Sequence, residues 1–302
     1  MDKIHDQDVF NLLNWRRAHH VGEWRRDKKG KWVHRKPGPN AKLISPFTVN
    51  DTIEQLKKLF TYLKNTGVKL SNPPNFSNPK FWLPEPKARP RAFSENERAG
   101  LNQALNTRED AEPIVLFSRM SGKRKNECVT LEWDHVRWDR DVIERHGKGG
   151  ALVTIKITPA IRAILWPLRG HHKKYVFTYV AQRNKKVKRK DGKEERLVKG
   201  QRYPYTTSGL RRTWTTLRQR AGIPIAGPDR VRWHDIRHDF AINFLRANPT
   251  AHGMKALQKA LDHSDFQTTA DTYAAVMDTE VDEQVEAQAQ KLLQERLAYK
   301  NK

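Results

Sequence analysis

The chain has 302 residues and a mass of 35.2 kDa, which is enough for two domains of ordinary size. It carries 58 lysines and arginines against 34 aspartates and glutamates, and a protein with a net charge of +24 is expected to bind a polyanion such as nucleic acid. The single cysteine, Cys128, excludes a disulfide framework, and no stretch is apolar enough for a signal peptide or a membrane span, so we expect a cytoplasmic, nucleoid-associated protein.

The first predicted domain, residues 1–90, carries 18 lysines and arginines against 8 acidic residues. Apolar residues at helical spacing predict a helix over residues 48–66, with Thr48 or Asn50 as its N-cap. A proline-rich stretch over residues 73–90 follows this helix and predicts a stiff, extended linker. We therefore expect a mainly helical domain that ends near residue 90.

Tryptophans and basic residues alternate near the start of this domain, where Trp15, Trp24 and Trp32 stand among arginines and lysines. Such mixing suits phosphate contacts that are combined with stacking on an aromatic ring. The alternative is that the tryptophans are buried beneath a solvated basic loop. On the first interpretation, the candidate DNA contacts are Arg16, Arg17, Arg25, Arg26, Lys28 and Lys29.

The second predicted domain, residues 91–302, begins at a capping-box pattern from Ser94 to Glu97 that starts a helix. Alternating apolar residues predict a small antiparallel sheet within residues 133–157. Residues 183–202 hold ten lysines and arginines against three acidic residues, which predicts a charged hairpin or loop. The candidate DNA contacts in this basic segment are Lys185, Lys186, Lys188, Arg189 and Lys190.

A His-x-x-Arg pattern precedes an apolar helical repeat and would place His234 and Arg237 on one face of a helix. A helix that starts near Asp235 would present its first amides to an anion, and an arginine can bind a phosphate through two hydrogen bonds. His234 and His238 could instead share a metal ion, but no third ligand is evident, so we expect no metal site. Residues 147–150 lack the Ser or Thr of a nucleotide-binding loop.

Further patterns occur on both sides of the His-x-x-Arg pattern. Arg124 stands in a Ser-Gly-Lys-Arg-Lys-Asn-Glu segment that leads to Leu-Glu-Trp, and Lys148 stands in a turn between two predicted strands. His263 lies in a Leu-Asp-His-Ser box, and Tyr273 follows it after ten residues. In order, residue type and spacing, these patterns resemble the catalytic domain of the tyrosine recombinases, the phage integrase family, over residues 92–278.

The resemblance implies an α+β fold, mainly helical with a small antiparallel sheet, in which a catalytic domain follows a helical DNA core-binding domain. It implies a site-specific recombinase or integrase that cuts and rejoins DNA through a 3′-phosphotyrosyl intermediate without a metal or other cofactor. Tyr273 would be the nucleophile, His234 would take its proton, and Lys148 would protonate the leaving 5′ oxygen. The implied catalytic set is Arg124, Lys148, His234, Arg237, His263 and Tyr273.

The chain departs from the family pattern beside two of these residues. Asp262 stands where the family usually has glycine, at a position expected to need a left-handed backbone, which glycine adopts more readily than aspartate. Lys123 and Lys125 replace the typically apolar neighbours of Arg124. Residues 1–45 match the family's N-terminal region only loosely.

Two other functions use similar features: a type IB-like topoisomerase, and a recombinase-derived DNA-binding protein that has lost cleavage. The complete set of six residues argues against the DNA-binding protein that has lost cleavage.

An amphipathic pattern over residues 279–299 predicts a C-terminal helix that either docks on a neighbouring subunit of a tetramer on DNA or folds back on its own domain. We expect the two basic domains to close as a clamp around duplex DNA, with a DNA-bending accessory protein as a further partner and no membrane contact.

Overall fold

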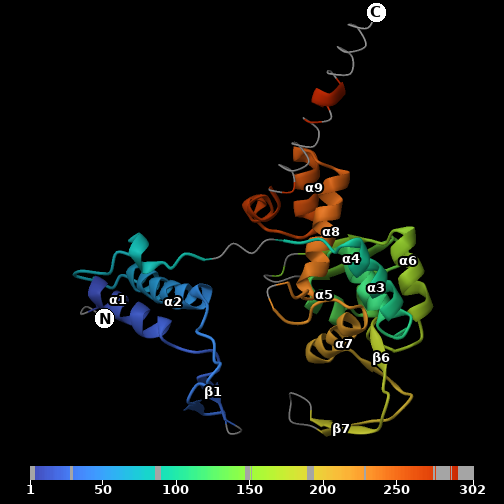
Figure 1. Cartoon of the computed structure of the whole chain (residues 1–302), viewed down its shortest axis with the longest axis horizontal. Helices are drawn as coiled ribbons and strands as arrows, with labels where there is room; N and C mark the ends of the chain where they lie inside the picture. The colour runs from blue at the N-terminus through green and yellow to red at the C-terminus, as the bar shows by residue number, and fades with distance from the viewer. Residues whose placement is uncertain are drawn as a thin grey trace, which may run out of the picture. The chain divides into compact units, whose positions relative to one another are not determined.

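The computed structural model describes residues 4–27, 30–85, 90–146, 150, 152–188, 194–227, 229–274, 276, 286 and 288–291. The chain divides into two compact units, Met1–Ala88 and Arg89–Lys302, and Figure 1 colours both along the sequence. Outside the described residues lie most of the predicted helix over residues 279–299 and the candidates Lys28, Lys29, Lys148, Arg189 and Lys190.

The described part of the first unit contains two α-helices and a short 3-10 helix. They are α1 (Asp6–Arg17), α2 (Pro46–Asn65) and η1 (Pro79–Phe81). Their apolar faces enclose a small core that is formed by Val9, Leu13, Val49, Ile53 and Phe81. Because α1 and α2 are both amphipathic, each covers the apolar face of the other and the unit buries a core of its own.

Helix α2 confirms the predicted helix, but both predicted N-caps were wrong. The cap is Ser45, whose hydroxyl oxygen accepts the backbone N–H of Thr48 at 3.3 Å. Asn50 lies inside the helix and is buried, and its side-chain amide donates to the carbonyl of Leu83 at 2.9 Å. The helix therefore starts earlier than its apolar pattern indicates, with Pro46 at its first position.

A small antiparallel hairpin, β1 (Trp24–Arg26) and β2 (Trp32–His34), follows α1 and was not predicted. The three tryptophans of this region are exposed to solvent: Trp15 by 57%, Trp24 by 46% and Trp32 by 58%. The alternative of buried tryptophans beneath a basic loop is therefore wrong. The guanidinium of Arg26 lies over the ring of Trp32, 5.3 Å from its centroid, so cations and aromatic rings are interleaved on the hairpin surface.

Helices form most of the second unit. They are α3 (Glu95–Leu105), α4 (Glu112–Ser121), α5 (Lys125–Val129), α6 (Pro159–Leu165), α7 (Thr207–Arg220), α8 (His234–Ala247) and α9 (Ala251–Ala260), with short 3-10 turns η2 (Trp133–His135) and η3 (Trp166–Leu168). Residues 266–274 are also helical. The predicted capping box is confirmed at α3, where the Ser94 hydroxyl accepts the Glu97 N–H at 3.2 Å.

The strands of the second unit form small antiparallel sheets. The predicted sheet is confirmed as β3 (Val136–Arg137), β4 (Val142–His146) and β5 (Leu152–Lys156), in that order. Strand β6 (Thr178–Val180) pairs with β9 (Arg202–Pro204), and β7 (Lys185–Lys188) pairs with β8 (Glu194–Leu197). The β7–β8 hairpin lies at the opposite end of this unit from α9 (Figure 1). The predicted fold class, mainly α with a small antiparallel sheet, is confirmed.

Two clusters of buried apolar side chains stabilise the second unit. The larger cluster joins α3, α4, α5 and α7 to the β3–β5 sheet. The smaller cluster lies where α8 packs on α9, and it includes Leu245, Leu257 and Leu261. Tyr273, from the helical residues 266–274, belongs to this smaller cluster and is only 1% exposed. The predicted nucleophile is thus packed against the helix that carries the His-x-x-Arg pattern.

Candidate active site

Arg237, near the start of α8, is buried and holds three separate segments together. Its guanidinium donates to the backbone carbonyl of Gly122 at 2.8 Å and to that of Leu261 at 2.5 Å. Gly122 directly follows α4, and Leu261 directly follows α9. Arg237 therefore brings the segment that leads to Arg124 and the segment that leads to His263 to the same end of α8.

The second arginine, Arg124, is the N-cap residue of α5, and its side chain is 46% exposed. It donates to the carboxylate of Glu127 at 3.2 Å. Burial and the charge of Arg124 lower the pKa of Arg237 to about 10, so Arg237 keeps its charge at neutral pH. Two guanidinium groups within electrostatic range of each other form a local positive potential that favours an anion.

His263 faces the same pair of arginines. Its Nδ1 hydrogen-bonds with the hydroxyl of the buried Thr269 at 2.7 Å, which orients the imidazole. Burial and the charges of Arg237 and Arg124 lower the pKa of His263 to about 4. The imidazole is therefore neutral at pH 7, and the nitrogen that does not contact Thr269 is available for a ligand.

His234 is the first residue of α8, and its side chain is exposed. The surrounding protein atoms and the charge of Arg237 lower its pKa below the ordinary value for histidine. Its ring packs edge-on against that of His238, with centroids 4.8 Å apart and an interplanar angle of 89°. His234 thus lies at the positive end of the helix dipole, where an anion is stabilised.

Tyr273 makes its hydrogen bond to His238, a residue that the sequence analysis considered only as a metal ligand. The tyrosine hydroxyl lies 2.8 Å from Nδ1 of His238. Burial raises the pKa of Tyr273 to about 12, and the charge of Arg237 opposes this effect. Because His238 is one helical turn after His234 on α8, its i, i+4 spacing was the available signal that it shares the face of the site.

The structure therefore brings five of the six predicted catalytic residues together at one end of α8, and Lys148 is the predicted residue that lies outside the described part of the chain. Strand β4 ends at His146 and β5 begins at Leu152, so Lys148 belongs to the segment that joins them. The arrangement combines two arginines, two neutral imidazoles and a buried phenol. The arginines and imidazoles can bind a phosphate, and the phenol has the chemistry of a nucleophile, although it is buried here.

The predicted DNA contacts that the structure describes lie on two hairpins and one helix. Arg16 and Arg17 end α1, and Arg16 donates to the hydroxyl of Thr52 at 3.2 Å. Arg25 and Arg26 lie on β1 and are exposed. On β7, Lys185 and Lys186 are also exposed, and Lys188 ends the strand.

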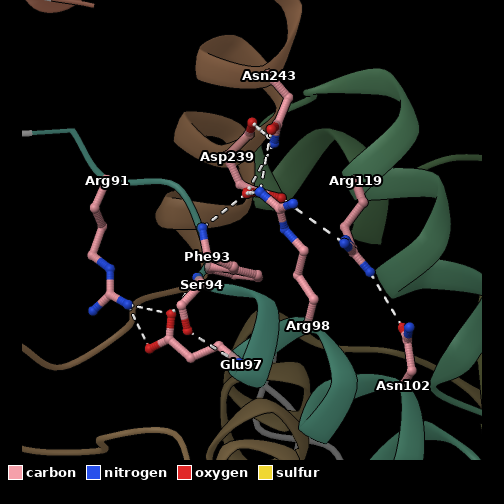
Figure 2. Close-up of polar contacts among 9 residues, drawn as sticks. All are labelled: Arg91, Phe93, Ser94, Glu97, Arg98, Asn102, Arg119, Asp239 and Asn243. Carbon is pink, nitrogen blue, oxygen red and sulfur yellow. Dashed lines mark hydrogen bonds and ion pairs between the residues drawn. The ribbon is translucent and has the colours of Figure 1, made fainter. Parts of the chain in front are cut away.

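The helix that carries the site is anchored on another side by Asp239, a buried carboxylate (Figure 2). Asp239 accepts the backbone N–H of Phe93 at 2.9 Å and a side-chain N–H of Asn243 at 3.1 Å. The guanidinium groups of Arg98 and Arg119 approach it at 3.4 Å and 4.0 Å. These contacts tie α8 to α3, to α4 and to the chain just before α3, so the backbone that carries the site residues is held rigidly.

Within the described residues, no group of three or more histidine, cysteine, aspartate and glutamate side chains is arranged to hold a metal ion. No helix of the described chain combines the length and the apolar character that crossing a membrane requires.

The arrangement of helices and sheets is that of solved tyrosine recombinases. It is similar to the XerH site-specific recombinase bound to its difH substrate, with a TM-score of 0.57 and 15% identity over 94% of this chain and 70% of that one. It is also similar to the Tn1549 transposon integrase in complex with circular intermediate DNA, with a TM-score of 0.56 and 15% identity over 90% of this chain and 81% of that one. At 15% sequence identity, these similarities show that the fold is shared.

In sequence, residues 92–280 match the model of the phage integrase family. This match spans more than half of the chain, which therefore belongs to the phage integrase family. The integrase of Salmonella phage P22 is 27% identical over 142 residues, which are 46% of this chain and 33% of that relative. The matched segment thus spans about a third of the length of the curated relative.

Proposed function

We propose that this protein is a site-specific DNA recombinase or integrase that cuts and rejoins strands through a 3′-phosphotyrosyl intermediate. The observation that carries the proposal is a buried tyrosine hydroxyl that lies 2.8 Å from Nδ1 of His238 on α8, the helix whose Arg237 joins the segments that lead to Arg124 and His263. Membership of the phage integrase family supports it. So does the fold, which similar proteins use while bound to DNA substrates.

The reaction is a transesterification. The Tyr273 oxygen forms a bond to the scissile phosphorus, the bond from phosphorus to the 5′ oxygen breaks, and the leaving oxygen takes a proton from Lys148. Arg124 and Arg237 stabilise the negative charge on the non-bridging oxygens, and His263 donates a further hydrogen bond. Because the phosphotyrosyl bond retains the energy of the broken phosphodiester, a second hydroxyl can reverse the step and no ATP is consumed.

The nucleophile must become accessible before it can react. Tyr273 is 1% exposed, so a phosphodiester cannot reach its hydroxyl in the free protein. We therefore infer that binding of DNA uncovers the hydroxyl of Tyr273 while its contact with His238 is kept. Such a change keeps the phenol away from other electrophiles until substrate is present.

Double-stranded DNA is the proposed partner of both units. The first unit and the second unit are both basic, and the exposed cations of the β1–β2 and β7–β8 hairpins suit phosphate contacts. A clamp of both units around the duplex, a tetramer on DNA that uses the C-terminal residues, and a DNA-bending accessory protein complete the proposal. The protein then works in the compartment that holds the DNA, the cytoplasm with its nucleoid.

The test uses a library of labelled duplexes with a randomised central sequence. Wild-type protein is incubated with the library and denatured, and the DNA that stays covalently attached is sequenced, which defines the cleavage site. Mass spectrometry of the adduct should map the attachment to Tyr273. Tyr273→Phe should still bind the selected duplex but form no adduct, because no other hydroxyl replaces the nucleophile.

Tyr205→Phe is the matched control, since Tyr205 is also buried in the second unit but lies in the larger cluster. It should form the adduct. An adduct on the Tyr273→Phe variant would disprove the catalytic assignment. Relaxation of supercoiled DNA without sequence preference would favour the topoisomerase instead, and binding without any adduct would favour a DNA-binding protein that has lost cleavage.

A further inference from the structure

A buried phenol needs an acceptor for its proton, and the structure places one beside Tyr273. Within the described residues, the group in hydrogen-bonding contact with its hydroxyl is Nδ1 of His238, at 2.8 Å. The two rings meet edge-on, with centroids 5.8 Å apart and an interplanar angle of 60°. A hydroxyl donates to a neutral imidazole nitrogen when that nitrogen carries no proton. In the tautomer whose Nδ1 carries no proton, the contact holds the phenolic proton on the line from the nucleophilic oxygen to Nδ1.

The protonation state of His238 agrees with this role. Burial and the neighbouring His234 lower the pKa of His238 to about 4, so the imidazole is neutral at physiological pH and can accept a proton. The charged and titratable groups that face it are His234, Asp235 and Arg237 on α8, His263 in the loop after α9, and Tyr273.

An incoming phosphate would make this imidazole a stronger base. Part of the lowered pKa of His238 comes from the positive charge of Arg237. A phosphodiester that binds Arg237 and Arg124 carries a negative charge, which compensates theirs and raises the pKa of a nearby imidazole. The basicity of His238 would then rise when the substrate is in place, which is the moment when the phenol has to lose its proton.

His234 is less suited to this task. It is exposed at the first turn of α8, and its contact in the site is with the ring of His238, 4.8 Å between centroids. Its position at the amino end of the helix suits hydrogen bonding to a non-bridging phosphate oxygen instead. The family resemblance assigns the proton of Tyr273 to His234, but the geometry of this chain favours the histidine one turn further along.

We propose that His238 is the general base of the cleavage step, and that His234 is a phosphate ligand. As the Tyr273 oxygen bonds to phosphorus and the 5′ oxygen leaves, the phenolic proton moves to Nδ1 of His238. In the reverse step His238 returns this proton to the departing tyrosine. The inference rests on the proposed function, because it presupposes that Tyr273 is the nucleophile.

The test compares His238→Asn with His234→Asn on the duplex selected by the wild-type protein, nicked so that cleavage cannot reverse. Asparagine can place its side-chain oxygen close to the position of Nδ1, so it can still accept the hydrogen bond of Tyr273 but cannot take its proton. We expect His238→Asn to keep thermal stability and DNA binding and to lose about a hundred- to ten-thousandfold in cleavage rate.

The pH profile separates a base from a positioning residue. Without its base, the phenol must ionise in solution, so the cleavage rate of His238→Asn should rise about tenfold per pH unit from about pH 7 towards pH 10. The wild type and His234→Asn should show nearly flat profiles over this range. A steep profile for His234→Asn with a flat one for His238→Asn would overturn the inference, even if one variant were poorly folded.

A substrate with sulfur in place of the leaving 5′ oxygen gives a second readout. A thiolate leaves without protonation, so this substrate should restore cleavage by Lys148→Ala but not by His238→Asn. Restoration of His238→Asn would make His238 part of the proton donor and overturn the inference. Failure of the proposed function looks different, because the wild-type adduct would then be absent or would map away from Tyr273.

Discussion

Lys123 and Asp262 form an ion pair that joins the residue before Arg124 to the residue before His263. Both positions are departures from the family pattern beside candidate catalytic residues. The ammonium group of Lys123 is almost fully buried and also donates to the carbonyl of Ala260 at 2.9 Å. Asp262 has φ +51°, which confirms the expected left-handed backbone. The two departures therefore compensate each other's charge.

The ion pair of Lys123 and Asp262 predicts that substitutions at the two positions change the free energy of unfolding in a non-additive way. Lys123→Met leaves the carboxylate of Asp262 without its partner, and Asp262→Gly relaxes the backbone but leaves a buried ammonium unpaired. In urea unfolding, the double variant should be more stable than the sum of the single effects by ~1–3 kcal/mol. The pair of Lys174, which is exposed, and Glu132, which is partly exposed, is the control; its groups are 3.3 Å apart and should couple by less than ~1 kcal/mol. Additive effects at Lys123 and Asp262 would contradict this prediction.

Asp239 should be the most sensitive acidic residue of the second unit. Asp239→Ala leaves the Phe93 amide and two arginines without their buried acceptor, so we expect a loss of ~3–5 kcal/mol in the free energy of unfolding. Asp239→Asn keeps an acceptor for the backbone N–H of Phe93 and should therefore lower the free energy of unfolding by less than Asp239→Ala does. Asp271→Asn, an exposed control, should change stability by less than ~0.5 kcal/mol. Equal effects of Asp239→Ala and Asp271→Asn would show that the network does not anchor α8.

Gly122 should tolerate no side chain. It has φ +62°, and a Cβ would collide with the ring of Phe240. Gly200 has φ +85° with open space around it, so Gly200→Ala measures the backbone strain alone. We expect Gly122→Ala to lower the free energy of unfolding by ~1–3 kcal/mol more than Gly200→Ala does, because of the collision. Combining Gly122→Ala with Phe240→Leu should restore part of the lost stability. If it restores none, the collision with the Phe240 ring is not the cause of the loss.

Acid should destabilise the second unit through its histidines. The pKa values of His238 and His263 are both lowered to about 4, whereas an unfolded chain takes up these protons near pH 6.5. Between these values the unfolded state binds more protons, so stability is complete above pH 6.5 and falls as the pH drops towards 4. Urea midpoints measured from pH 7.5 to pH 4 should show this slope. His263→Gln and His238→Asn should each flatten it, and an unchanged slope would contradict the assignment.

The β7–β8 hairpin should contribute to DNA affinity and not to chemistry. It lies at the opposite end of its unit from α9 (Figure 1), and Lys185 and Lys186 on β7 are exposed. Alanine at Lys185, Lys186, Lys188, Arg189 and Lys190 should weaken binding and reduce the salt dependence of log Kd by up to about 0.9 per lost phosphate contact. The cleavage rate at saturating DNA should stay unchanged. A slower rate with unchanged affinity would assign the hairpin to the site.

Several elements of the fold could be predicted because their signals lie within a few consecutive residues. The capping box at Ser94, the helix over residues 48–66 and the strands within residues 133–157 follow from short-range signals, because each hydrogen-bonding pattern lies within a few residues. The catalytic candidates followed from the resemblance of the ordered motifs to those of the tyrosine recombinases. Of these candidates Arg124, His234, Arg237, His263 and Tyr273 come together in the fold.

The contacts among these residues depend on how distant segments of the chain pack together. Tyr273 contacts His238 and not His234. The two histidines are one helical turn apart on α8, so the histidine that meets the tyrosine depends on how the helix over residues 266–274 packs on α8. Lys123 and Asp262 are 139 residues apart, and the sequence around either one gives no sign of the opposite charge that pairs with it. Their pairing, like the burial of the nucleophile, results from long-range packing, which fixes distances that no local pattern encodes.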